Sequence, residues 1–170
     1  DMEGEAPKMV KLTTSDGEET EVRKDIAEKS VLIKGVLDDA GDEEPVPLPS
    51  VTKPILDKVI VYMTYISRPE KKMPKIKCPL VDADLKNSIE DHWYVEYVNI
   101  DKKHLYDVIL AANFMDIKSL LKLTTAKVAT YLKGKTLEEM RAEFGVTDHG
   151  FSEEEYKQIL LENKWAEEAF

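Results

Sequence analysis

The sequence predicts an α+β fold, with a small sheet near the amino terminus and packed helices through the rest of the chain. Two short extended runs, 9–12 and 20–22, flank Asp16-Gly17, a pair typical of a β-hairpin turn. From Asp101 onward, apolar residues recur every three or four positions between helix-capping signals. Strands followed by a run of helices indicate an α+β domain.

Composition narrows the class of protein. The chain has 170 residues, with 24 Lys and Arg against 34 Asp and Glu, which gives a net charge of −10. Such a charge opposes non-specific binding to nucleic acid or anionic lipid, so neither partner is predicted. The single cysteine, Cys78, excludes an internal disulfide and a multi-cysteine zinc site. Because the chain shows no leader and no apolar run long enough to cross a bilayer, we expect a soluble intracellular protein.

The first half of the chain contains short elements with recognisable ends. Residues 1–8 are acidic and small, and we expect a flexible tail. Asp25 and Ser30 are each candidate helix caps, and Gly41 is a candidate end for the second helix. The proline-rich run 45–49 suits an edge strand, because proline donates no ladder hydrogen bond.

The next helix and the segment after it have contrasting patterns. Ser50 or Thr52 is the candidate cap of a helix whose apolar face includes Ile55 and Val59. Residues 67–92 are predicted to form a variable linker, because prolines and basic residues crowd its first half. The basic cluster lacks interleaved aromatic residues, as expected of a solvated segment rather than a nucleic-acid site.

The second half shows strong helix punctuation. Asp101 and Asp116 are candidate caps of two successive helices, and Gly134 suits the left-handed residue that ends the second. Thr136 and Ser152 each stand three residues before a glutamate, which is the capping-box pattern. Two short helices are therefore predicted after residue 134.

We find no catalytic constellation. Gly134-Lys135-Thr136 resembles the end of a phosphate-binding loop, but Ala129 occupies the position where that loop needs a glycine. The helix-end and helix-cap interpretation therefore takes precedence over a nucleotide-binding enzyme, which stays as the alternative of another class. The three histidines are scattered, and no Gly-x-Ser-x-Gly elbow occurs. We predict a protein that is not an enzyme and needs no cofactor or metal.

The last helix carries more apolar surface than one packed face requires. Phe151 and Tyr156 flank its first turn as a hydrophobic staple, and Leu160 continues the stripe. Leu161 and Trp165 extend the apolar arc to a second face. Either the helix packs wholly onto its own domain, or a second polypeptide covers one side. Aromatic anchors favour the second alternative slightly.

Six runs of sequence, taken together and in order, resemble the S-phase kinase-associated protein family, the adaptor subunits of cullin-based SCF ubiquitin ligases. The runs are VKLTTSDGEETEV, PVPLPSV, ILDKVI, NIDKKHLYDVILAANFMDIKSLL, KGKTLEEMRAEF and FSEEEYKQILLENKW. The resemblance covers roughly residues 10–66 and 93–165.

The resemblance implies a BTB/POZ fold for residues 9–133, which docks on a cullin, and a helical F-box-binding extension at 134–170. The family's cullin-contacting pair falls on Asn113 and Phe114. The family's F-box surface falls on Leu105, Tyr106, Leu121, Val128, Leu132, Phe144, Val146, Phe151, Tyr156, Leu160 and Trp165.

The implied function is a non-catalytic adaptor that joins F-box substrate receptors to a cullin and so supports ubiquitination and degradation of substrates. The alternative is an adaptor that recruits F-box proteins without a cullin. A cytoplasmic and nuclear location is expected. From the apolar extension we also expect the free chain to self-associate or to have a mobile carboxyl-terminal tail.

The chain departs from the family pattern at four places. Phe114 stands where tyrosine is usual, so the phenolic hydroxyl is missing. Glu153 stands where some relatives have a modifiable proline. Residues 68–77 are basic where most relatives have an acidic or small-residue loop, and 145–150 is one residue longer than usual.

Overall fold

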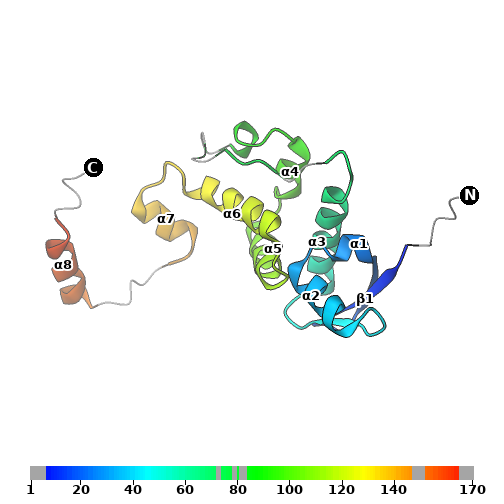
Figure 1. The fold of residues 1–170 in the computed structure, drawn as a ribbon. Helices are drawn as coiled ribbons and strands as arrows, with labels where there is room; N and C mark the ends of the chain where they lie inside the picture. Colours follow the sequence, from blue (N-terminus) through cyan, green and yellow to red (C-terminus); the bar gives the residue numbers. More distant parts are fainter. Residues whose placement is uncertain (1–6, 72–73, 78–79, 81–83, 147–151, 165–170) are drawn as a thin grey trace, which may run out of the picture. The chain divides into compact units, whose positions relative to one another are not determined.

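The computed structural model describes residues 7–71, 74–77, 80, 84–146 and 152–164. The chain forms two compact units, Asp1–Lys133 and Gly134–Phe170. Figure 1 shows the strands and most of the helices in the first unit and two helices in the second. Strands and helices together confirm the predicted α+β class.

The sheet begins with the predicted hairpin. Strands β1 (Met9–Thr14) and β2 (Glu19–Arg23) pair antiparallel, with Val10 opposite Val22. Gly17 in the turn has φ of 80°, a left-handed value that glycine adopts without strain. β3 (Val46–Leu48) pairs in parallel with β1, so the strand order is β2-β1-β3 and the proline-rich run forms an edge strand.

The first unit surrounds this sheet with helices. Their bounds are α1 (Lys24–Ala27), α2 (Val31–Ala40), α3 (Lys53–Ile66), the 3-10 helix η1 (Leu85–Asn87), α4 (His92–Tyr97), α5 (Lys102–Phe114) and α6 (Lys118–Leu132). Helix α5 packs against both α3 and α6 (Figure 1). The sheet and the helices share one hydrophobic core. Its largest fully buried side chains include Leu12, Leu48, Leu56, Tyr62, Met63, Leu105 and Leu120.

The ends of α2 follow the sequence pattern, whereas the start of α1 does not. Ser30 caps α2, because its side chain accepts a hydrogen bond from the Ile33 amide at 3.2 Å. Gly41 ends α2 with φ of 83°. The prediction that Asp25 is a helix cap is wrong. Asp25 lies inside the first turn of α1, where its carboxylate bonds the Arg23 side chain and so cannot serve as the N-cap.

Helix α3 begins at the predicted place with a different capping group. Thr52 is its N-cap residue, but the threonine side chain makes no cap hydrogen bond. Both carboxylate oxygens of Asp16 instead accept from the Lys53 amide at 3.1 Å. Asp16 belongs to the hairpin turn, so one side chain links the sheet to the start of α3.

The second half of the predicted linker is part of the folded unit. Asp84 caps η1, and Leu85 and Ile89 are buried in the core. Asp91 caps α4 by accepting from the Trp93 amide at 3.1 Å, so the range predicted as linker ends on a helix.

The second unit contains α7 (Leu137–Glu143) and α8 (Glu153–Glu162). Both predicted capping boxes are confirmed, Thr136 with Glu139 and Ser152 with Glu155. Gly134 follows the C-cap residue of α6 with φ of 78°, as a left-handed helix end requires. The proposed staple residue Phe151 and the anchor Trp165 lie outside the described residues.

Candidate partner-binding surfaces

The end of α5 carries the candidate cullin-contacting pair. Asp101 caps the helix through the His104 amide at 3.1 Å, which sets the register of the helix. Asn113 is exposed and Phe114 is half-buried against the core. The pair therefore presents one exposed side-chain amide and one partly covered aromatic ring.

The turn after this pair corrects the prediction that Asp116 caps α6. Asp116 has φ of 48°, and its amide donates to the Asn113 carbonyl at 3.2 Å. The Ile117 amide donates to the Ala112 carbonyl at 2.9 Å. These two bonds form a Schellman motif, which ends α5, and Asp tolerates the left-handed position that the motif needs. Ile117 is then the N-cap residue of α6, with no side-chain cap bond.

Helix α6 supplies an apolar stripe. Leu121, Val128 and Leu132 are all half-buried, and their spacing of seven and four residues places them on one face of the helix. We call these three residues the α6 stripe. Tyr106 on α5 is also half-buried. Leu105 is fully buried, so the structure places it in the core and not on the surface that the resemblance implies.

The second unit exposes most of its apolar residues. Within their described bounds, α7 and α8 contain no buried residue. Phe144 is 39% exposed, Val146 48% and Leu160 47%, while Tyr156 is half-buried. The exposed fractions of Leu137 (61%) and Leu161 (73%) are larger still.

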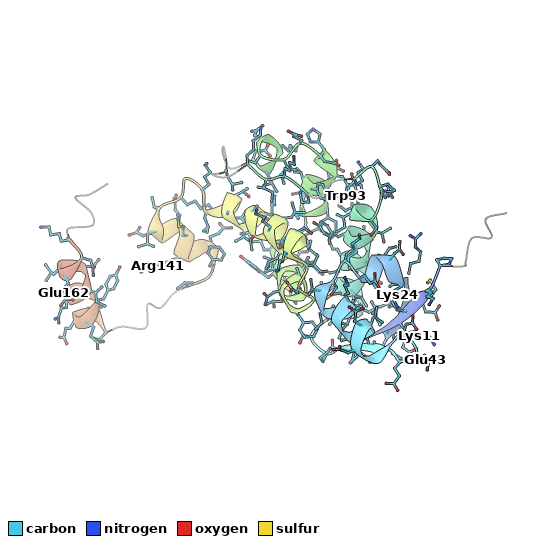
Figure 2. The ribbon with its side chains drawn as sticks, viewed as in Figure 1. Lys11, Lys24, Glu43, Trp93, Arg141 and Glu162 are labelled. Carbon is cyan, nitrogen blue, oxygen red and sulfur yellow. The ribbon has the colours of Figure 1, made fainter. Side chains whose placement is uncertain are left out.

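Those two leucines are missing from the site predicted from sequence. Leu137 is the first residue of α7 and lies inside the capping box, a pattern that predicts the start of a helix but not the exposure of its apolar residues. Leu161 shows a signal in the sequence, because it widens the apolar arc of α8. Arg141 of α7 contacts Tyr156 of α8: its guanidinium carbon lies 5.7 Å from the Tyr156 ring centroid, and its Nη1 donates to the Tyr156 hydroxyl at 3.4 Å. Figure 2 labels Arg141 on α7 and Glu162 on α8.

An aromatic cluster holds the start of the basic segment. The Trp93 ring of α4 stacks on Tyr65 of α3, with the ring centroids 3.7 Å apart, and this contact joins the two helices. Within α4, Trp93 also stacks on Tyr97 at 5.1 Å. Asp91 accepts from the Tyr65 hydroxyl at 2.8 Å and from Lys71 at 3.2 Å. The hydroxyl bond, then the Trp93 amide and Lys71, hold the pKa of the Asp91 carboxyl below its usual value. Burial raises the pKa of Tyr94 to about 12.

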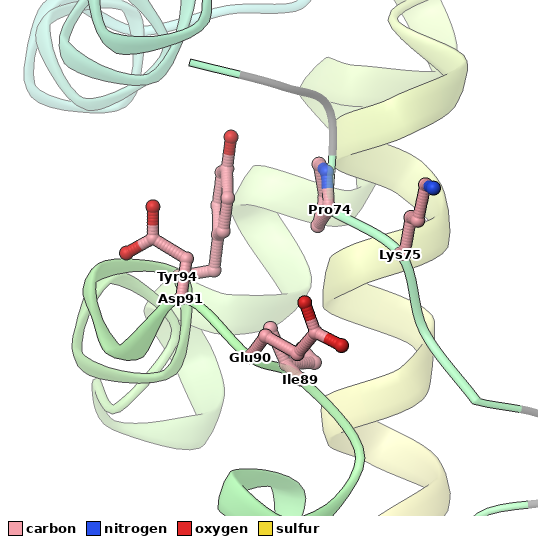
Figure 3. Close-up of a pocket in the computed structure, with 6 residues that line it drawn as sticks. All are labelled: Pro74, Lys75, Ile89, Glu90, Asp91 and Tyr94. Atoms are coloured by element: carbon pink, nitrogen blue, oxygen red, sulfur yellow. The ribbon is translucent and has the colours of Figure 1, made fainter. Parts of the chain in front are cut away.

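A small pocket lies beside this cluster. It is lined by Pro74, Lys75, Ile89, Glu90, Asp91 and Tyr94. Figure 3 shows Pro74 and Lys75 across the pocket from Asp91 and Tyr94. The Asp91 carboxylate is bonded to Tyr65, Lys71 and the Trp93 amide, so its hydrogen bonds have a structural role.

The residues that suggest chemistry have structural roles. Lys135 pairs with Glu143, and Thr136 completes the α7 capping box, so the helix-end interpretation of Gly134-Lys135-Thr136 is confirmed. Across the described part of the chain, His, Cys, Asp and Glu side chains form no group of three or more that could hold a metal ion. Among the same residues, no helix has the length and apolarity to cross a bilayer.

Comparison with known proteins agrees with the fold and with the sequence runs. Residues 8–67 match the POZ-type domain described as "Skp1 family, tetramerisation domain", and residues 118–166 match "Skp1 family, dimerisation domain". The S-phase kinase-associated protein 1 homolog of Tetrahymena thermophila is 42% identical over 161 residues, which is 94% of this chain and 95% of the relative.

Fungal relatives match over nearly the same length. The E3 ubiquitin ligase complex SCF subunit sconC of Arthroderma benhamiae is 39% identical over 168 residues, 98% of this chain and 100% of the relative. Its namesake in Aspergillus fumigatus is 40% identical over 160 residues, 94% of this chain and 98% of the relative. Identity of this level over both domains and nearly the full length shows that the chain belongs to the Skp1 family.

Proposed function

We propose that this chain is a non-catalytic adaptor that joins F-box substrate receptors to a cullin in an SCF-type ubiquitin ligase. Relatives that match it over nearly their whole length carry the name of an SCF subunit. The observation in the structure that carries the proposal is the second unit, whose described helices bury none of their residues.

The exposed leucines explain why a partner is needed. A short helix in water is marginally stable, and most of its stability in proteins comes from packing its apolar face. Leu137, Leu160 and Leu161 are exposed, so the described part of the chain supplies little of this packing. A helical F-box segment that covers them would convert exposed apolar area into binding energy at roughly 25 cal/mol per Å² before the costs of association.

The α6 stripe and Tyr106 are the residues of the proposed F-box surface that belong to the first unit. Leu121, Val128 and Leu132 present half-buried aliphatic groups that a helix can pack upon. Asn113 and Phe114 form the proposed cullin contact. They are the last two residues of α5, before the turn that leads into α6. The chain would then hold two proteins at once on different parts of its surface.

Reconstitution tests the proposal. The purified full chain is mixed with a recombinant F-box domain and with the amino-terminal repeats of a cullin, and the mixture is separated by size-exclusion chromatography. We expect one ternary species that neither partner forms without the chain. Binding of the F-box domain alone would support the cullin-independent adaptor, and binding of neither partner would refute the proposal.

A further inference from the structure

An apolar groove lies along α6, next to the α6 stripe and lined by other residues. Ile76 and Leu80 form one wall, and Thr125, Ala126 and Ala129 form the other, with Lys122 completing the lining. The groove has a volume of about 330 Å³. Its lining is almost entirely aliphatic or methyl-bearing, and its one charged group is the exposed Lys122.

The wall formed by Ile76 and Leu80 is held in place by the first unit. Both side chains are half-buried and pack against the core. The Lys77 amide donates to the Ser88 carbonyl at 3.1 Å, and the Lys133 ammonium donates to the Leu80 carbonyl. These contacts tie the segment to η1 and to the end of α6.

The groove is continuous with the α6 stripe. Thr125 follows Leu121 by four residues and precedes Val128 by three, so its side chain is a surface neighbour of both. Ala129 stands in the same relation to Leu132, three residues on. A helix laid along the stripe therefore meets the groove at its edge without crossing the core.

We propose that this groove is the selectivity-determining part of the F-box surface and takes an aliphatic side chain of the bound F-box segment. The inference rests on the proposed function. The apolar walls suit a leucine- or isoleucine-like group, and Lys122 suits a carboxylate next to that group in the partner. The groove is thus specific for an aliphatic side chain that has a carboxylate beside it.

The origin of the wall explains why it selects among partners. Ile76 and Leu80 come from the segment between α3 and η1, and not from the helices that supply the rest of the proposed surface. The α6 stripe supplies apolar contact to any F-box helix. The wall adds a contact that depends on the shape and charge of the individual partner, which is how closely related ligands are discriminated.

The test uses the full chain and a recombinant F-box domain chosen because it binds the unaltered chain with a dissociation constant measurable by calorimetry. Leu80→Ser removes one of the two aliphatic side chains of the wall, and Lys122→Glu reverses the charge at an exposed position. We expect each variant to bind about tenfold more weakly, the loss typical of one interface contact. The matched control Lys34→Glu, on the exposed face of α2, is expected to bind as the unaltered chain does.

A photo-crosslinking residue at position 80 supplies the second measurement. We expect it to capture the F-box domain, and the same residue at position 34 to capture nothing. Unchanged affinity of Lys122→Glu together with no crosslink from position 80 would overturn the inference while leaving the proposed function intact. Capture of a second copy of this chain from position 80 would also overturn it, because the groove would then be a self-association site. Failure of every F-box domain to bind the unaltered chain would refute the proposed function itself.

Discussion

The Ser30 hydroxyl donates a hydrogen bond of 2.5 Å to the Met115 carbonyl, a group that is 85 residues away in the sequence. The same oxygen accepts from the Ile33 amide and so caps α2. Met115 is the C-cap residue of α5 and directly follows Phe114. One fully buried hydroxyl therefore joins the start of α2 to the end of the helix that carries the proposed cullin contact.

We expect Ser30→Ala to lower the free energy of unfolding by about 2 kcal/mol, because it removes an N-cap and a buried hydrogen bond together. Urea denaturation followed by circular dichroism measures the change. The control Ser50→Ala removes an exposed hydroxyl and is expected to have little effect. A Ser30→Ala variant as stable as the unaltered chain would show that the link between α2 and α5 contributes nothing.

We expect Asn113→Lys combined with Phe114→Lys to abolish capture of a cullin and to spare binding of an F-box domain. Burying two added lysine ammonium groups in an interface carries a large desolvation penalty, and the aromatic contact of Phe114 is lost. Because Phe114 is half-buried, Asn113→Lys alone serves as the variant with an unperturbed core. Lys103→Glu, exposed on the same helix, is the charge control. Cullin capture by the double variant would show that Asn113 and Phe114 lie outside the cullin contact.

We expect Leu161→Asp to leave the fold of the chain unchanged and to weaken F-box binding by tenfold or more, as for the loss of an interface anchor. Leu161 is 73% exposed, so the substitution removes no internal packing. Lys157→Asp, also exposed on α8, is the control for the added negative charge. Equal affinities of the two variants would show that Leu161 lies outside the interface.

The capping boxes predict how the helicity of the second unit depends on pH. The Thr136 amide bonds the Glu139 carboxylate at 2.8 Å, and the Ser152 amide bonds the Glu155 carboxylate at 2.9 Å. These bonds hold the pKa of each carboxyl below its ordinary value of 4.5. The stabilisation is therefore complete above pH 4.5 and is lost as the pH falls through the lowered pKa values.

Circular dichroism between neutral and acidic pH, on the unaltered chain and on Glu139→Gln with Glu155→Gln, measures this dependence. The glutamine side chains keep a carbonyl acceptor in each capping box but do not titrate. We expect the unaltered chain to lose more helical signal on acidification than the double variant. Identical acid profiles would show that the carboxylates do not stabilise α7 and α8.

Local patterns predicted the elements whose capping groups are neighbours in sequence. The Asp16-Gly17 hairpin, the Ser30 cap and the two capping boxes all depend on residues within a few positions of one another. The resemblance to the family was confirmed because its six runs extend over both domains. The exposed apolar arc of α8 was likewise readable from the spacing of its leucines.

The predictions fail where helix capping or burial depends on a residue distant in sequence or on the backbone conformation. Asp116 is of a residue type that often caps helices, but the Schellman motif that ends α5 places it in a left-handed conformation. Asp16 caps α3 from the hairpin turn, which no local pattern at Thr52 reveals. Leu105 was assigned to the F-box surface by the family resemblance alone, and the packing of α5 against α3 and α6 buries it.

The central claim is that the apolar residues of α7 and α8 are covered by a partner and not by this chain. Hydrogen exchange of the α8 amides, measured by mass spectrometry on the chain alone and on its complex with an F-box domain, tests it most directly. We predict fast exchange across Glu153–Glu162 in the free chain and at least about tenfold slower exchange in the complex, because covering a marginal helix suppresses its local opening. Slow exchange of these amides in the free monomer, unchanged by the F-box domain, would contradict the account.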